Sequence, residues 1–334
     1  TGQKIWLDFD YDATRDFSID LQAFGLGSSG APVLSAKVEE EVIAAVLDRV
    51  QIAYHDQDPN QRGEPDPVAV DFFSTDPGGG DVTRVCVGGE DPSGGSTIGS
   101  ILIDPNNSRR SSEECASLPP TGVFPSELMV LAWDATFQET FDPLRPGAGG
   151  IPVGEHPLDP IVLDELFDPG SATPEELERY GQIYDAVDRF GAVLGSIVAH
   201  EVGHALGLVP PSAPGIGLYG GSSGARYAHS VTPSGADPPE NELMKAGNTF
   251  TFSKLGGLNG EPLPFFRPLN FAYLRDRVLA YTPVTELLPP PGITSVAPAV
   301  IDQSATQITV TGDGFAATPA IRCVNQSYSY NAFG

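Results

Sequence analysis

The 334-residue sequence predicts an α+β fold. Short runs of alternating or continuous apolar residues predict strands in the first third of the chain. Longer stretches with apolar residues at helical spacing, at 37–54 and 190–206, predict helices. Three consecutive prolines at 289–291 predict a stiff linker. After it, the residue pattern predicts short strands. We therefore expect a mixed domain over residues 1–288 and a small all-β segment over 289–334.

The strands are expected where the apolar patterns are short. Residues 1–11 place apolar side chains at alternate positions, which is typical of a strand with one buried face. Residues 68–73 and 83–87 are short segments rich in apolar residues and predict buried strands. Residues 98–103 and 127–133 are further strand candidates.

Three main helical regions are expected, and the second of them contains two helices in succession, over 174–188 and 190–206. The first covers residues 37–54, with acidic residues in the first turn, where the helix dipole favours negative charge. Thr173, followed by proline, predicts the start of a helix over 174–188. Residues 190–206 follow as a buried helix that is apolar nearly all round. Residues 268–281 predict the last helix.

The composition excludes several classes of function. The chain has 18 Lys plus Arg and 44 Asp plus Glu, and its net charge of −26 repels nucleic acid and anionic lipid. It has no apolar run long enough to span a membrane. Acidity, few lysines, and 38 Gly with 32 Pro favour a secreted or cell-surface protein. Any signal peptide or pro-segment is expected to precede Thr1, and the oligomeric state stays open.

Three cysteines are too few for a disulfide scaffold. Cys86 and Cys115 form a candidate disulfide across a loop, which would leave Cys323 over. Buried free thiols are the alternative at each position.

The chemically informative segment is His200-Glu201-Val202-Gly203-His204, inside the predicted buried helix. Histidines four residues apart lie on one helix face and can bind the same metal ion. Glu201, at the edge of that face, can reach a metal-bound water, whose pKa Zn²⁺ lowers towards about 7. The carboxylate can then remove a proton, and pass it later to a leaving amine. The alternative is that both histidines are hydrogen-bonded residues of the core and bind no metal.

A catalytic zinc usually has three protein ligands, so one more is required. His229 lies beyond Gly207, where the helix should stop, in the segment expected to pass under the helix. We predict His229 as the third ligand, and expect His55 and His156 to have no metal role. The acidic rivals for this position are Asp237, Glu240 and Glu242.

The segment that begins at His200 resembles the metzincin zinc-protease signature H-E-x-x-H-x-x-G-x-x-H/D, and is most similar to the matrixin branch. In that family the glycine ends the active-site helix, and Gly207 matches it. The third ligand would fall at Pro210, which cannot bind metal. We interpret this as an insertion before His229, whose following serine resembles the matrixin His-Ser pair. Leishmanolysin-like metzincins also carry an insertion here.

Residues 242–247 resemble the Met-turn, whose methionine packs beneath the zinc site. Met244 is one of only two methionines; ordinary core packing is its alternative role. The resemblance covers roughly residues 1–285. It implies a twisted, mostly parallel sheet with an antiparallel edge strand, along which an extended substrate lies above the zinc. Residues 97–103 and 127–133 both qualify as that edge strand.

The C-terminal segment resembles the start of a TIG-type immunoglobulin-like domain, through residues 292–298 and 308–315. It is under half the length of a usual sandwich of about 100 residues. This resemblance implies either the beginning of such a domain or a small variant.

A second metal is considered for four N-terminal carboxylates, those of Asp8, Asp10, Asp12 and Asp16. The spacing lacks the glycine and terminal glutamate of an EF-hand loop, so we interpret them as solvated acids at a strand end. A structural Ca²⁺ elsewhere in the acidic loops stays a hypothesis without an assigned position.

Together, the residues and the resemblance predict a secreted zinc endopeptidase that acts on protein or peptide substrates, with Glu201 as general base. Two alternatives stay open. One is a non-proteolytic metal-binding surface module whose C-terminal segment serves adhesion. The other is a gluzincin-type zinc hydrolase with Glu240 or Glu242 as the third ligand.

Overall fold

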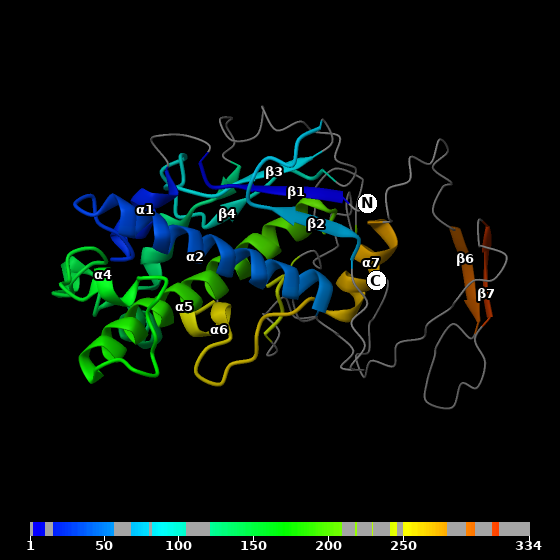
Figure 1. The fold of residues 1–334 in the computed structure, drawn as a ribbon. Helices are drawn as coiled ribbons and strands as arrows, with labels where there is room; N and C mark the ends of the chain where they lie inside the picture. Colours follow the sequence, from blue (N-terminus) through cyan, green and yellow to red (C-terminus); the bar gives the residue numbers. More distant parts are fainter. Residues whose placement is uncertain are drawn as a thin grey trace. The chain divides into compact units, whose positions relative to one another are not determined.

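The computed structural model describes residues 3–10, 16–56, 68–79, 82–104, 121–208, 218, 229, 241–245, 250–278, 292–297 and 309–313. The chain forms two compact units, Thr1–Ala280 and Tyr281–Gly334. The first unit mixes helices and strands (Figure 1). In chain order its elements are β1 (Gln3–Asp8), α1 (Phe17–Ala23), α2 (Pro32–Gln51), η1 (Ile52–Asp56), β2 (Val70–Phe73), β3 (Thr83–Cys86), β4 (Gly99–Ser100), β5 (Gly122–Val123), η2 (Pro125–Leu131), α3 (Ala135–Phe141), η3 (Pro146–Ala148), α4 (Asp159–Val162), α5 (Pro174–Ala205), α6 (Phe252–Gly256) and α7 (Pro268–Arg277).

The sheet of the first unit is parallel at its centre. Strand β1 lies between β2 and β3, and both pairings are parallel. A single parallel bridge from Val87 to Val123 leads on to β5, and β4 pairs with β5 in the antiparallel direction. Strand β4 therefore lies at the antiparallel end of a mainly parallel arrangement.

Helices α2 and α5 lie along one side of this sheet (Figure 1). Two glycines on α5 allow them to pack closely. A methyl group at Gly191 would lie 2.3 Å from the Cβ of Ala45, and one at Gly195 would lie 2.7 Å from the Cβ of Arg49. Neither position has room for a larger side chain, so these glycines determine the separation of the two helices.

Helix α5 is one continuous helix of 32 residues, although the sequence analysis divided it near residue 188. Because no proline interrupts the chain there, the two apolar stretches join. Thr173 and Glu176 form a reciprocal capping box at the start of the helix. The helix stops before Gly207, which has a φ of +112° and turns the chain away.

Other element boundaries also differ from expectation. The strand predicted over residues 127–133 is wrong: this segment belongs to the 3₁₀ helix η2, which begins at Pro125 and buries Leu128 and Leu131. Proline fixes the φ of the first helical residue, and apolar residues at i and i+3 face the same side of a 3₁₀ helix. Helix α2 begins at Pro32, before the predicted residue 37, for the same reason.

The second unit contains an antiparallel pair, β6 (Gly292–Ala297) and β7 (Thr309–Asp313), with a register shift between Ile293 and Ser295.

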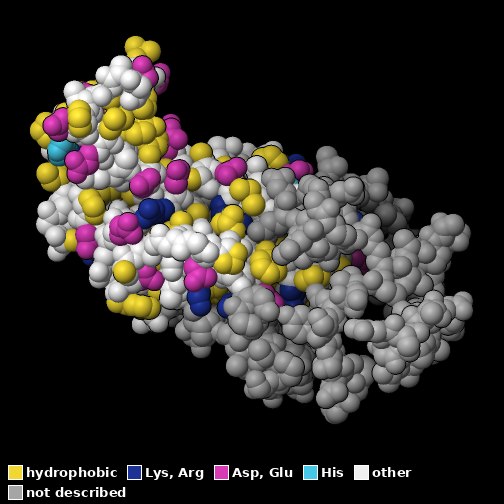
Figure 2. Space-filling view, turned by 90° about the horizontal axis from the view of Figure 1, so that it is seen from below, with side chains coloured by type: hydrophobic (Ala, Val, Ile, Leu, Met, Phe, Trp, Pro, Cys, Tyr) yellow, Lys and Arg dark blue, Asp and Glu magenta, His cyan; other side chains and the backbone are white. Residues whose placement is uncertain are grey.

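On the face drawn in Figure 2, most of the coloured charged side chains are acidic. Figure 2 shows Asp and Glu side chains spread over one face, with smaller groups of Lys and Arg. Within the described part of the chain, no helix combines the length and the apolar character needed to cross a membrane.

Candidate metal centre

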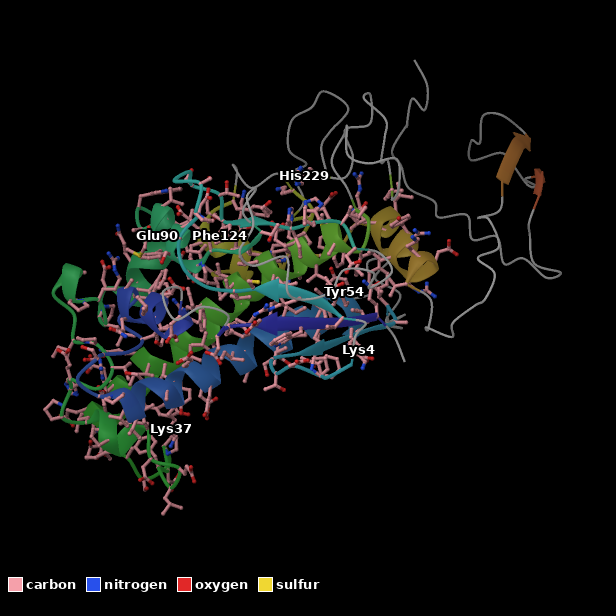
Figure 3. The ribbon with its side chains drawn as sticks, turned by 90° about the horizontal axis from the view of Figure 1, so that it is seen from above. Lys4, Lys37, Tyr54, Glu90, Phe124 and His229 are labelled. Carbon is pink, nitrogen blue, oxygen red and sulfur yellow. The ribbon has the colours of Figure 1, made fainter. Side chains whose placement is uncertain are left out.

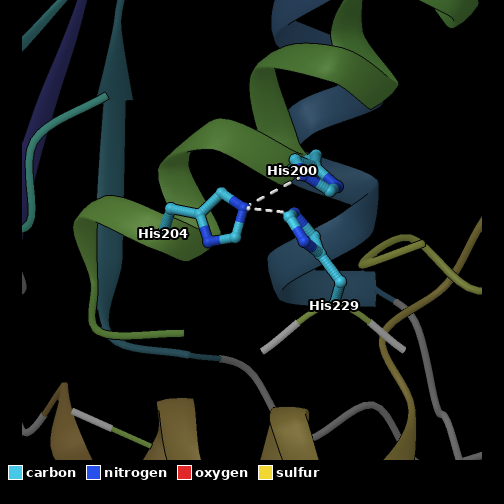
Figure 4. A group of neighbouring side chains, drawn as sticks. All are labelled: His200, His204 and His229. Atoms are coloured by element: carbon cyan, nitrogen blue, oxygen red, sulfur yellow. Dashed lines mark hydrogen bonds between the residues drawn. The ribbon is translucent and has the colours of Figure 1, made fainter. Parts of the chain in front are cut away.

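Three histidine side chains meet at the C-terminal end of α5 (Figure 4). His200 and His204 are four residues apart on the helix, and His229 comes from the segment beyond Gly207. The Nε2 atom of His204 lies 3.1 Å from Nε2 of His200 and 3.0 Å from Nε2 of His229. Figure 3 shows His229 over the C-terminal part of α5. The structure thus gathers the three histidines that the sequence analysis singled out as ligands.

Backbone carbonyls determine the tautomers of the two helical histidines. The Nδ1 atom of His200 lies 2.7 Å from the carbonyl oxygen of Leu243, and Nδ1 of His204 contacts the carbonyl oxygen of Leu208. A carbonyl only accepts, so each Nδ1 must carry the proton and donate it. In the neutral rings, Nε2 then presents a lone pair towards the other histidine.

Two lone pairs that face each other at 3.1 Å repel unless a cation lies between them. A proton is disfavoured, because burial and the neighbouring histidines lower the pKa of His200 to about 4 and that of His204 well below its usual value. A metal ion between the rings would satisfy all three nitrogens. Tetrahedral zinc with bonds of about 2.05 Å would hold two nitrogens about 3.3 Å apart, close to the separations found here.

Glu201 lies next to His200 and is almost fully buried, with 6% of its surface exposed. Strand β4 covers it: a methyl group at Gly99 would lie 2.6 Å from Oε1 of Glu201 and 2.8 Å from Cδ. Burial raises the pKa of Glu201 to about 8, whereas a cation nearby would favour the charged carboxylate. The carboxylate is thus held between the histidines' helix and the strand at the sheet edge.

Met244 and Leu243 form the floor beneath the histidines. Met244 is fully buried, and its sulfur would lie 3.0 Å from a methyl group placed at Gly203. The ring of Phe266 packs against the same glycine. The glycine within the histidine motif therefore allows the floor to approach the helix, while the carbonyl of Leu243 orients His200.

Tyr54 is a supporting residue that the sequence analysis missed. It is fully buried in the π-helical turn η1, and its hydroxyl donates to the carbonyl oxygen of Ala199 at 2.8 Å (Figure 3). Burial, and secondarily the charge of Glu201, raise its pKa well above the usual value. An aromatic residue at the end of an amphipathic helix gives no sequence signal for this role.

The other candidate ligands lie apart from the histidines where the structure describes them. Glu242 is buried beside Arg267, whose Nε lies 3.7 Å from its Oε2. His55 is half-buried, with Nε2 2.7 Å from the carbonyl oxygen of Val70. His156 accepts a hydrogen bond from the backbone of Leu158. Asp237 and Glu240 lie outside the described residues.

Cys86 is buried and disulfide-bonded. Its predicted partner, Cys115, lies outside the described residues, and so does Cys323. The pairing of Cys86 with Cys115 therefore stays a prediction.

A group of carboxylates lies near the end of β1. Asp10, Asp16 and Glu39 each place an oxygen within 4.8 Å of the others. Burial and the charges of Asp16 and Asp10 raise the pKa of Glu39 to about 7. Asp8, included in the predicted group, instead pairs with Arg84, and Asp12 lies outside the described residues. Acidic groups of this kind are common without a bound ion.

Comparisons of the chain with protein-family models, curated proteins and solved structures gave no match.

Proposed function

We propose that this chain is a zinc-dependent endopeptidase of the metzincin type, secreted or displayed at a cell surface. The observation that supports it most strongly is the convergence of three histidine Nε2 atoms beside a buried glutamate. Met244 beneath the histidines and Gly207 at the helix end agree with the family's arrangement. The antiparallel strand β4, next to Glu201, agrees with its edge strand.

The positions of the site residues suggest a role for each of them. His200, His204 and His229 would hold the metal, and a bound Zn²⁺ supplies Lewis acidity at the site. Glu201 takes a proton from the attacking water and returns it to the leaving amine. Strand β4 offers backbone groups along which an extended peptide can align, as in other cases of strand addition.

Metal content and cleavage test the proposal together. Wild type should hold about one zinc per chain after reconstitution and cleave casein or gelatin. His229→Ala should lose both properties. Glu201→Gln should keep its zinc and lose cleavage by a factor of about 10² to 10⁴. His156→Ala is the matched control, because this histidine lies apart from the site, and should keep both.

Three results would contradict the proposal in different ways. Wild type without zinc after reconstitution would remove the metal site. Zinc retained in His229→Ala would redirect the search to Asp237, Glu240 and Glu242. Zinc without cleavage of any peptide in wild type would favour a metal-binding surface module.

A further inference from the structure

A buried arginine lies between the two long helices, and no function described above uses it. Arg49 on α2 has 3% of its surface exposed. Burial lowers the pKa of its guanidinium to about 10, and no acidic group in the described part of the chain offsets this effect. A buried cation without a carboxylate is costly, so the contacts that it makes require an explanation.

The guanidinium of Arg49 donates to two separate parts of the site. Its Nε donates to the hydroxyl of Ser196 at 2.9 Å, and one terminal nitrogen donates to the carbonyl oxygen of Pro264 at 2.6 Å. Ser196 lies one helical turn before His200 on α5. One planar group therefore joins the helix that presents His200 to the segment around Pro264.

The segment that contains Pro264 leads directly to the floor of the site. The carbonyl oxygen of Phe265 accepts from the backbone N–H of Leu243 at 2.6 Å, and the N–H of Phe265 donates to Asn241 at 3.2 Å. The carbonyl of Leu243 is the group that orients the ring of His200, at 2.7 Å. Arg49 thus connects to His200 from both sides, through the helix and through the floor.

We infer that Arg49 is a positioning residue for the metal centre: it holds the floor at a fixed distance from α5, so that the Leu243 carbonyl sets the orientation of His200. Groups that orient a histidine ligand contribute to metal affinity even without touching the ion, and their loss costs about 10- to 100-fold. The rigid fork of arginine suits this two-point contact, because a lysine ammonium is a single point charge on a flexible stem. This inference rests on the proposed metal site.

The test compares metal affinity in variants of the full chain, measured by competition with a chelator well below the melting temperature. Arg49→Met should bind Zn²⁺ about 10- to 100-fold more weakly, and the absorption spectrum of its Co²⁺ form should change because the ligand geometry has shifted. Arg49→Lys keeps the charge and one donor, and its zinc affinity should lie between those of wild type and Arg49→Met. It also serves as the readout if Arg49→Met does not fold.

Arg179→Met is the matched control. Like Arg49, Arg179 is 3% exposed. It lies on α5 but near the end opposite the histidines, where it binds Asp159 and the carbonyl of Pro152. This variant should be less stable and keep the wild-type metal affinity and Co²⁺ spectrum.

The inference is overturned if both Arg49 variants bind zinc within about twofold of wild type, or if Arg179→Met loses as much affinity as Arg49→Met. A wild type that binds no zinc would instead refute the proposed function itself. The two failures are therefore distinguishable.

Discussion

Replacing Gly99 by alanine should impair catalysis without removing the metal. Gly99 lies on β4, against Glu201, and its φ is outside the left-handed region, so alanine suits the backbone. The added methyl group would lie 2.6 Å from Oε1, 2.7 Å from Cγ and 2.8 Å from Cδ of Glu201. Because Cγ is included, rotation of the carboxylate alone cannot relieve the overlap.

The magnitude follows from the required displacement. Carbon atoms pack at about 3.5 to 4.0 Å, so Glu201 or β4 must move by about 1 Å. A misplacement of that size can cost about 10²-fold in rate, which corresponds to about 2.7 kcal/mol of transition-state stabilisation. The histidine nitrogens are not touched, so zinc content should stay at the wild-type level. Overpacking of this kind also costs about 1–3 kcal/mol of stability.

The assay is steady-state cleavage of a casein-derived peptide, with zinc measured on the same samples and with folding checked by thermal melting. Ser100→Ala, on the same strand, is the control and should retain wild-type activity. Full activity in zinc-loaded Gly99→Ala would show that the position of Glu201 against β4 has no catalytic importance, and would refute this reasoning.

Three further predictions concern stability. Burial raises the pKa of Asp20 from 3.8 to about 6, so between these values the folded state keeps a proton that the unfolded chain releases. The free energy of unfolding therefore falls by about 3 kcal/mol as the pH rises from about 4 to about 6. Asp20→Asn should remove this pH dependence in urea unfolding, and an unchanged slope would contradict the assignment. Asp159→Asn leaves Arg179 buried without its carboxylate and should cost about 3–5 kcal/mol in urea unfolding, whereas a loss below about 1 kcal/mol would be typical of an exposed pair. In thermal melts, the free energy of unfolding should fall by about 2–5 kcal/mol in Met244→Ala and by less than about 1.5 kcal/mol in Met244→Leu. Equal losses in the two variants would mean that the floor is not tightly packed.

Local signals in the sequence were sufficient for much of the fold. The alternating pattern near the N-terminus and the apolar runs before residue 90 produced the three parallel strands, because strand periodicity depends on neighbouring residues alone. Thr173 and Gly207 marked the limits of α5 for the same local reason. The strand predicted over residues 127–133 was wrong, because apolar content in a short segment does not distinguish a strand from a 3₁₀ helix that packs on the core.

The sequence by itself determined the relation between His200, Glu201 and His204, since helical geometry places residues four apart on one face and the next residue at its edge. Only the tertiary structure decided that Leu243 and Leu208 orient those rings, that Gly99 covers Glu201, and that β4 rather than the segment near 127–133 lies beside the site. Except for the contact of His204 with Leu208, four residues further on, these contacts join residues far apart in the chain. Both ring contacts use backbone carbonyls, which every residue has. A residue's type therefore cannot reveal them, whereas the packing of α5 between the sheet and the floor does.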